Sequence, residues 1–133
     1  STIYRFTSAE VAAALIGAPG SGLSATGHEW LDYSALYAGG ASSMLVDANG
    51  VLIVSFTEFN SSSSLVGFEV DGNGDYNGND SLILTSDGRL GEIRFHNGEL
   101  YVADENFIYR LVPEPSSLLF SVLGLAFFAR RKR

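Results

Sequence analysis

The chain of 133 residues contains no cysteine. Disulfide bonds, zinc–thiolate sites and thiol catalysis are therefore excluded, and the redox compartment is left unconstrained. Charged residues are scarce, at 17% against 46% hydrophobic residues, which is typical of a packed, β-rich domain and not of a disordered chain. A chain of this length has room for one small domain with its own core.

Positive charge is rarer still. Lysine and arginine together number eight against fifteen acidic residues, and four of the eight form the terminal cluster Arg130, Arg131, Lys132 and Arg133. The rest of the chain is therefore strongly acidic and offers no cationic surface for a phosphate backbone. We predict no nucleic-acid partner, whereas divalent cations and neutral glycans stay compatible with this charge.

Histidine is almost absent as well. The two histidines, His28 and His96, lie in unrelated segments of the chain. The stretch HEWLD around His28 begins like a zinc-protease helix, but Asp32 stands where the second histidine of that motif is required. This pattern predicts neither a histidine metal site nor a catalytic residue.

A secretion signal is also missing from the first residues. The chain starts at Ser1, and no basic and apolar stretch follows. We expect the chain either to begin behind a removed signal or to be a fragment of a longer protein. The fragment is favoured because the strand repeats described below are too few to close a ring.

A short helix is predicted over residues 8–16. Thr7 and Glu10 have the spacing of a capping box, and Gly17 with Pro19 supplies the stop. The next residues, 17–42, show no sustained period and are predicted to form a long connection with some buried aromatic side chains.

From residue 43 to residue 112 the pattern is that of β-strands. Alternating apolar segments flank two turns, Asn49-Gly50 and Asn97-Gly98, and these residue types tolerate the positive φ values that hairpin turns need. The turns lie 48 residues apart, and each hairpin is followed by a third strand-like segment. A repeat of roughly 40–50 residues with up-and-down strands is typical of a propeller blade.

The same alternation predicts which side chains are buried. The predicted core positions are Val46, Leu52, Val54, Phe68, Ile93, Leu100, Val102 and Ile108. A helix across either hairpin would contradict this pattern.

The segment GEIRFHNGELYVADENFIYRL, residues 91–111, resembles the NHL and sugar-dehydrogenase-like group of β-propellers. The resemblance extends more loosely over residues 43–112. It implies an all-β fold of antiparallel propeller-type blades, about two to two and a half of them within residues 1–112, and it implies no activity. Because a closed ring needs at least about four blades, the alternatives are the C-terminal fragment of a longer propeller or another antiparallel β fold, such as a smaller open sheet or sandwich.

The segment DGNGDYNGND, residues 71–80, is the strongest metal-binding candidate. Oxygen-bearing side chains alternate with small residues, which lets a tight loop direct several hard oxygens at one calcium ion. The candidate ligands are Asp71, Asn73, Asp75, Asn77 and Asn79. The match then weakens, because Tyr76 replaces the turn glycine and Leu82 replaces the closing acidic ligand. The alternative is an ordinary connection rich in Asn and Gly, without any ion.

The last residues differ from all the others. Pro113, Glu114 and Pro115 are followed by the uncharged, mostly apolar residues 116–129 and then by the basic residues 130–133. The apolar run is shorter than the ~20 residues that span a bilayer, but basic side chains can reach the interface and hold that end in the cytoplasm. A short C-terminal transmembrane helix is therefore expected within residues 113–133.

These three features, in this order, closely resemble the PEP-CTERM sorting signal of exported bacterial proteins. The resemblance implies recognition by exosortase, a membrane processing enzyme, through Pro113, Glu114 and Pro115. It assigns the basic residues 130–133 to topology. It also implies transient anchoring in the membrane and then delivery to the cell surface or the extracellular polymer matrix.

The sequence therefore favours an exported, non-enzymatic binding or structural protein whose partners are exosortase, the membrane and extracellular polysaccharide. The alternative is an exported propeller enzyme, of the sugar dehydrogenase or lactonase type, with its active site in blades that precede residue 1. Further blades with convergent His, Asp, Glu or Arg side chains would favour the enzyme. Calcium is the single cofactor that the sequence suggests.

Overall fold

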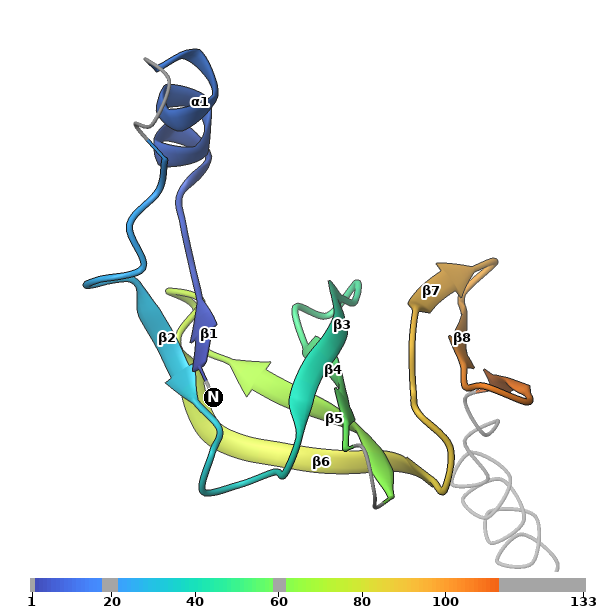
Figure 1. Ribbon diagram of the computed structural model, residues 1–133. Coiled ribbons are helices and arrows are strands. Elements are labelled where there is room, and N and C mark those ends of the chain that lie inside the picture. The colour runs from blue at the N-terminus through green and yellow to red at the C-terminus, as the bar shows by residue number, and fades with distance from the viewer. Residues whose placement is uncertain (1, 18–21, 59–61, 113–133) are drawn as a thin grey trace, which may run out of the picture.

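The computed structural model describes residues 2–17, 22–58 and 62–112. Over these ranges the chain forms one short helix and nine strands (Figure 1). The elements are β1 (Thr2–Tyr4), α1 (Ser8–Ile16), β2 (Glu29–Asp32), β3 (Gly40–Val46), β4 (Leu52–Thr57), β5 (Ser63–Val70), β6 (Tyr76–Ser86), β7 (Ile93–His96), β8 (Glu99–Ala103) and β9 (Ile108–Leu111). All strand pairs are antiparallel, and they form sheets of two, four and three strands. The predicted antiparallel β structure is thus confirmed for the described residues.

The four-stranded sheet β3-β4-β5-β6 is an up-and-down meander, in which neighbours along the chain are neighbours in the sheet. It lies between the β1-β2 pair and the β7-β8-β9 sheet (Figure 1). Side chains of the inner strands β4 and β5 alternate between its two faces, and both faces are covered. This is why residues 51–54 are continuously apolar instead of alternating with polar residues.

Two apolar cores hold the three sheets together. The first joins β1-β2 to the central sheet around Phe56 and Phe68, which are almost completely buried. The ring centroid of Phe68 lies 6.1 Å from that of Phe56 and 5.6 Å from that of Tyr76. The second core joins the central sheet to β7-β8-β9, with Leu65 and Val102 buried at its centre.

Serine side chains connect the central sheet to the segment that leads into β7. Ser55 is fully buried, and its Oγ donates a hydrogen bond to the Gly91 carbonyl at 3.0 Å. Ser42 Oγ donates to the Leu90 carbonyl at 2.8 Å. Since backbone carbonyls removed from water need a donor, these hydroxyls satisfy carbonyls that lie between two sheets. This role of the serine side chains was not predicted from the sequence.

Helix α1 confirms the predicted helix at both ends. Thr7 is the N-cap residue: its Oγ1 accepts the Glu10 N–H at 3.2 Å, and the Glu10 carboxylate accepts the Thr7 N–H at 2.7 Å. These are the reciprocal bonds of a capping box. Gly17 is the C-cap residue, whereas Pro19 lies outside the described residues. No residue of α1 is buried, and the helix projects away from the three sheets (Figure 1).

The second hairpin has the predicted turn. Asn97 and Gly98 have φ values of 52° and 80°, and His96 pairs with Glu99 across the two-residue loop. Positive φ at both loop positions is the geometry that matches the twist of the flanking strands.

The first hairpin differs from the prediction. Gly50 has a φ of 86°, but Asn49 does not have a positive φ. The Asp47 carboxylate accepts the N–H groups of Asn49 and Val51, each at 2.8 Å, and the Gly50 N–H donates to the Asp47 carbonyl. These local hydrogen bonds hold Asn49 at a negative φ. The prediction of a positive φ at Asn49 was therefore wrong.

Most of the predicted core positions are correct. The buried or partly buried ones are Val54, Phe68, Ile93, Leu100, Val102 and, partly, Leu52. Val46 and Ile108 were wrong, because they are 62% and 76% exposed. Val46 ends the edge strand β3, and Ile108 begins the edge strand β9. Alternation separates the two faces of a strand, but it does not tell how far the covering sheet extends over each face.

Three stretches of strand were not predicted. Residues 29–32 form β2, residues 40–42 begin β3, and residues 76–80, expected to be loop, begin the long strand β6. In β6, Tyr76 pairs with Val70 and Asp80 with Phe68, with irregular register around Gly78. Because Asn, Asp and Gly are depleted in strands, propensity pointed to a loop, and pairing with β5 overrode it.

No helix within the described ranges is long and apolar enough to cross a membrane. The predicted transmembrane segment and the predicted sorting residues, 113–133, lie outside the described residues.

Candidate functional site

The first three predicted calcium ligands form a tight turn between β5 and β6. Asp71 Oδ1 accepts the backbone N–H groups of Asp75 at 3.0 Å and Asn73 at 2.8 Å, and these bonds lower the pKa of Asp71. Asp75 Oδ1 lies 3.0 Å from Nη2 of Arg5. The turn is therefore closed by backbone donors, and one of its carboxylates pairs with a cation.

The last two predicted ligands, Asn77 and Asn79, lie in β6. Their side-chain amides donate to the Glu69 carboxylate on β5, at 3.3 and 3.2 Å. The five residues are thus divided between the turn and the strand. The part of the chain that the structure describes contains no group of three or more His, Cys, Asp or Glu side chains that could hold a metal ion.

Calcium binding at this turn stays a prediction, and Arg5 competes with the ion for the Asp75 carboxylate. If the ion binds, calcium should raise the melting temperature of the full chain. The rise should increase in Arg5→Gln, which removes the competing cation, and disappear when Asp71 and Asp75 are both replaced by alanine. Thermal unfolding in millimolar calcium or chelator measures the effect. Equal melting temperatures in both, for the wild type and for Arg5→Gln, would contradict calcium binding.

A polar hollow of about 340 Å³ lies beside this turn and beside the start of β2. Its lining residues are Arg5, Thr7, Glu10, Gly27, His28, Glu29, Trp30 and Asp75. This site was not predicted from the sequence, because its residues come from separate segments, as far apart as residues 5 and 75. Trp30 was the available signal, since it is the single tryptophan of the chain.

Arg5 and Trp30 separate the polar hollow from an apolar one. The Gly74 carbonyl accepts hydrogen bonds from Arg5 Nη1 at 2.6 Å and from Trp30 Nε1 at 2.7 Å. Both side chains also line an apolar hollow of about 360 Å³. The other residues of that hollow are Ile3, Tyr4, Met44, Val46, Gly50, Leu52, Val70 and Gly74. The turn at 71–75 therefore positions an arginine and a tryptophan between a polar and an apolar surface.

His28 and Glu10 connect α1 to the start of β2. His28 Nε2 lies 2.8 Å from Glu10 Oε1, and the His28 ring stacks on Phe6 with 4.6 Å between centroids. Hydrogen bonds from Thr7 and from His28 lower the pKa of Glu10 to about 2, and the bond to Glu10 raises the pKa of His28. His96 lies in β7, in a different sheet.

We expect hydrogen-exchange protection of the α1 amides to be greatest between about pH 4.5 and pH 6.5, the ordinary pKa values of these two side chains. Because folding lowers the pKa of Glu10, the ionised carboxylate stabilises the contact fully when the pH is above the unfolded pKa of 4.5. This contribution is lost as the pH falls towards about 2, the pKa in the folded chain. Because folding raises the pKa of His28, the protonated ring stabilises the contact fully when the pH is below the unfolded pKa of 6.5. This contribution is lost as the pH rises through the pKa of His28 in the folded chain.

His28→Gln should lower the protection factors of α1 and remove their decline at high pH, while the matched variant His96→Gln should leave them unchanged. Exchange measured by mass spectrometry from pH 5 to pH 9 provides the comparison. The same pH dependence in His28→Gln and wild type would show that this pair does not hold the helix.

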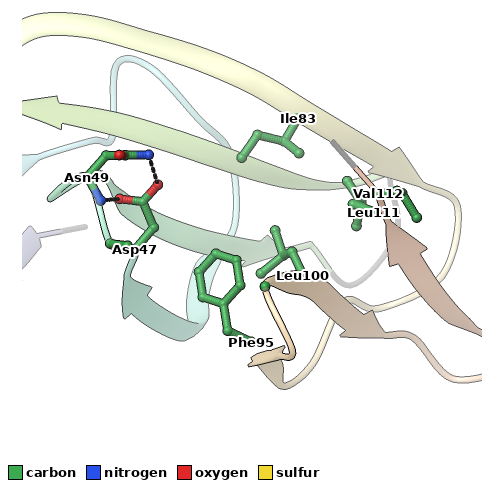
Figure 2. A pocket seen from close by; sticks show the side chains of 9 residues that line it. Asp47, Asn49, Ile83, Phe95, Leu100, Leu111 and Val112 are labelled. Carbon is green, nitrogen blue, oxygen red and sulfur yellow. Dashed lines mark hydrogen bonds between the residues drawn. The ribbon is translucent and has the colours of Figure 1, made fainter. Parts of the chain in front are cut away.

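A larger apolar hollow of about 710 Å³ opens where the chain leaves β9. Figure 2 labels seven of its lining residues: Asp47, Asn49, Ile83, Phe95, Leu100, Leu111 and Val112. The polar members, Asp47 and Asn49, are hydrogen bonded to each other within their own turn (Figure 2). The remaining wall is apolar, and Val112 is the last described residue before the predicted sorting signal.

Among known protein families, a match is found for the end of the chain. Residues 111–133 match the PEP-CTERM protein-sorting motif. No curated protein and no solved structure matches the chain. The match begins at Leu111, the last residue of β9, and it includes all the residues predicted for the sorting signal. The motif supports an exported protein that exosortase processes and that is anchored in the membrane through its C-terminus before processing.

Proposed function

We propose that the protein acts at the cell surface or in the extracellular matrix as a non-enzymatic binding or structural protein, after exosortase has removed its C-terminal anchor. The match of residues 111–133 to the sorting motif is the observation that carries this proposal. The match overlaps the end of β9, so the sheet passes directly into the signal. Residues 1–112 are then the displayed part of the molecule.

The residue types of the signal fit these steps. Pro113 and Pro115 lack a backbone N–H and disfavour helix, which keeps the segment before the apolar run accessible to a processing enzyme. The basic residues 130–133 resist transfer through hydrocarbon, so they hold their end of the chain in the cytoplasm. The apolar residues between them form the temporary anchor.

We further propose that the three sheets belong to successive blades of a β-propeller, with the β1-β2 pair and the β7-β8-β9 sheet as incomplete blades, so that residues 1–112 supply about two to two and a half blades. The meander order β3-β4-β5-β6 supports this proposal. So does the cover on both faces of the central sheet, because neighbouring blades pack face to face. Extracellular polysaccharide is the proposed partner of this displayed region.

The test of the sorting proposal is the C-terminal mass of the protein in a bacterial host that has an exosortase and in the same host without it. We expect protein recovered from the surface of the first host to lack the basic end, and protein from the second host to be full-length and membrane-bound. Surface protein with an intact residue 133 in both hosts would contradict the proposal.

A further inference from the structure

We propose that the polar hollow beside Trp30 is a binding site for a neutral saccharide. The inference rests on the proposed surface role, and it names the residues that would contact a matrix polysaccharide. It depends on the hydrogen-bonding capacity, the charge and the aromatic surface of one cavity. The cavity volume, about 340 Å³, lies within the range of roughly 300–1,000 Å³ that is usual for small-molecule sites.

The polar wall of the hollow contains carboxylate oxygens that can accept hydrogen bonds from a ligand. Glu29 uses Oε2 to accept the Gly27 N–H at 3.0 Å, and Asp75 uses Oδ1 to pair with Arg5. Among the described residues, no hydrogen bond or ion pair is found for Glu29 Oε1 or Asp75 Oδ2. Arg5 is the main donor, and it already donates to the Gly74 carbonyl and to Asp75. A ligand that matches this wall must therefore bring donors, as the hydroxyl groups of a sugar do.

The charge of the hollow excludes anionic ligands. Three carboxylates, those of Glu10, Glu29 and Asp75, line it together with the cations of Arg5 and, when protonated, His28. The whole chain has a net charge of -7, so the surrounding field also repels anions. A polysaccharide rich in carboxylate or sulfate groups would be repelled by the carboxylates of the hollow and by the net negative charge of the chain. An uncharged polysaccharide would not be repelled.

Trp30 supplies the aromatic surface of the site, next to the adjoining apolar hollow. Trp30 lines both the polar and the apolar hollow, and Tyr4, which is 44% exposed, lines the apolar one. Aromatic rings combine a flat apolar face with a polar edge. A sugar ring has hydroxyl groups around its rim and C–H groups on its faces, so it can satisfy the acceptor wall and the aromatic surface together. A peptide would also bring backbone carbonyls, for which this wall has few free donors.

Intrinsic fluorescence tests the proposal directly, because Trp30 is the single tryptophan of the chain. The full chain, kept in a detergent without a sugar headgroup, is titrated with neutral oligosaccharides of glucose, mannose, galactose and N-acetylglucosamine. Alginate oligomers, as the anionic counterpart, and a casein hydrolysate, as a peptide mixture, are titrated in parallel. We expect a saturable change with at least one neutral oligosaccharide and none with alginate or peptide.

Two variants locate the binding. Glu29→Gln keeps the shape of the side chain but removes its charge, and it should weaken binding about tenfold, the loss expected for a hydrogen bond to a charged group. Glu105→Gln, in the β8-β9 turn where Glu105 pairs with Arg89, is the matched control and should bind like the wild type. Calorimetry with Trp30→Phe should show weakened binding without relying on the fluorophore.

The proposal is overturned if no neutral oligosaccharide changes the fluorescence, or if alginate or the peptide mixture binds as well as the best sugar. Equal affinity of Glu29→Gln, Trp30→Phe and wild type would also overturn it, because binding would then occur elsewhere. These titrations use purified protein and do not involve exosortase. A failure of the saccharide site is therefore distinguishable from a failure of the sorting proposal, which is measured in cells.

Discussion

Replacing Phe68 with alanine is expected to lower the free energy of unfolding by about 3–5 kcal/mol, the usual cost of deleting a buried aromatic ring. Phe68 is fully buried in β5, and its ring contacts those of Phe56 and Tyr76 within the first core. Because small domains are stable by only about 5–15 kcal/mol, the variant should lose much of its stability. Urea unfolding of the full chain, followed by circular dichroism, measures the change.

Phe107→Ala is the matched control for this prediction. Phe107 is 65% exposed in the turn before β9, so its loss should change the free energy of unfolding by no more than about 0.5 kcal/mol. A similar small change for Phe68→Ala would show that the β1-β2 pair does not cover the central sheet in solution. A large loss in Phe107→Ala would show that the exposed turn is covered by something else.

Replacing Pro113 and Pro115 together with alanine is expected to leave full-length protein in the membrane of a host that has an exosortase. Because proline disfavours helix and alanine permits it, the substitution removes the feature that we propose keeps this segment accessible to the enzyme. The measurement is the C-terminal mass of membrane and surface fractions. Pro19→Ala, the remaining proline of the chain, is the control and should be processed like the wild type.

Replacing the four basic residues 130–133 with serine should give a different defect. Each cation costs about 2.5–3.5 kcal/mol at the bilayer centre, so its removal should weaken retention and orientation before processing. Recognition through Pro113, Glu114 and Pro115 should be unaffected in the molecules that remain anchored. Equal release of the proline variant and the wild type, each with residue 133 intact, would show that the tail is a hydrophobic terminus that only imitates the signal.

Local features of the fold were predictable because they depend on neighbouring residues. The capping box of Thr7 and Glu10 begins α1 at the predicted residue, and the Asn97-Gly98 turn has the predicted φ values. Both features are determined by backbone geometry and hydrogen bonds within four residues. The Asn49-Gly50 turn shows the limit, because the Asp47 carboxylate changed its geometry from only two positions away.

The sorting motif is likewise a property of the sequence alone. Its order of prolines, apolar run and basic cluster is readable without any fold, and the family match begins two residues before Pro113. Exosortase processing and membrane anchoring follow from this linear order. The calcium prediction rested on a linear pattern too, but its ligands depend on the fold, which divides them between the turn at Asp75 and the strand at Asn77.

Only the tertiary structure decided which surfaces meet. Val46 and Ile108 stand at positions where the alternation of apolar and polar residues predicts burial, yet both side chains are exposed. Burial depends on how far a second sheet extends over a strand, which the alternation does not show. Arg5, Trp30 and Asp75 form one hollow although 70 residues separate the first from the last. Their contact requires β1, β2 and the β5-β6 turn to lie against one another. Long-range packing of this kind has no short-range signal, so the chain determined its helix, its turns and its sorting signal locally, whereas its binding surfaces depend on how the three sheets stack.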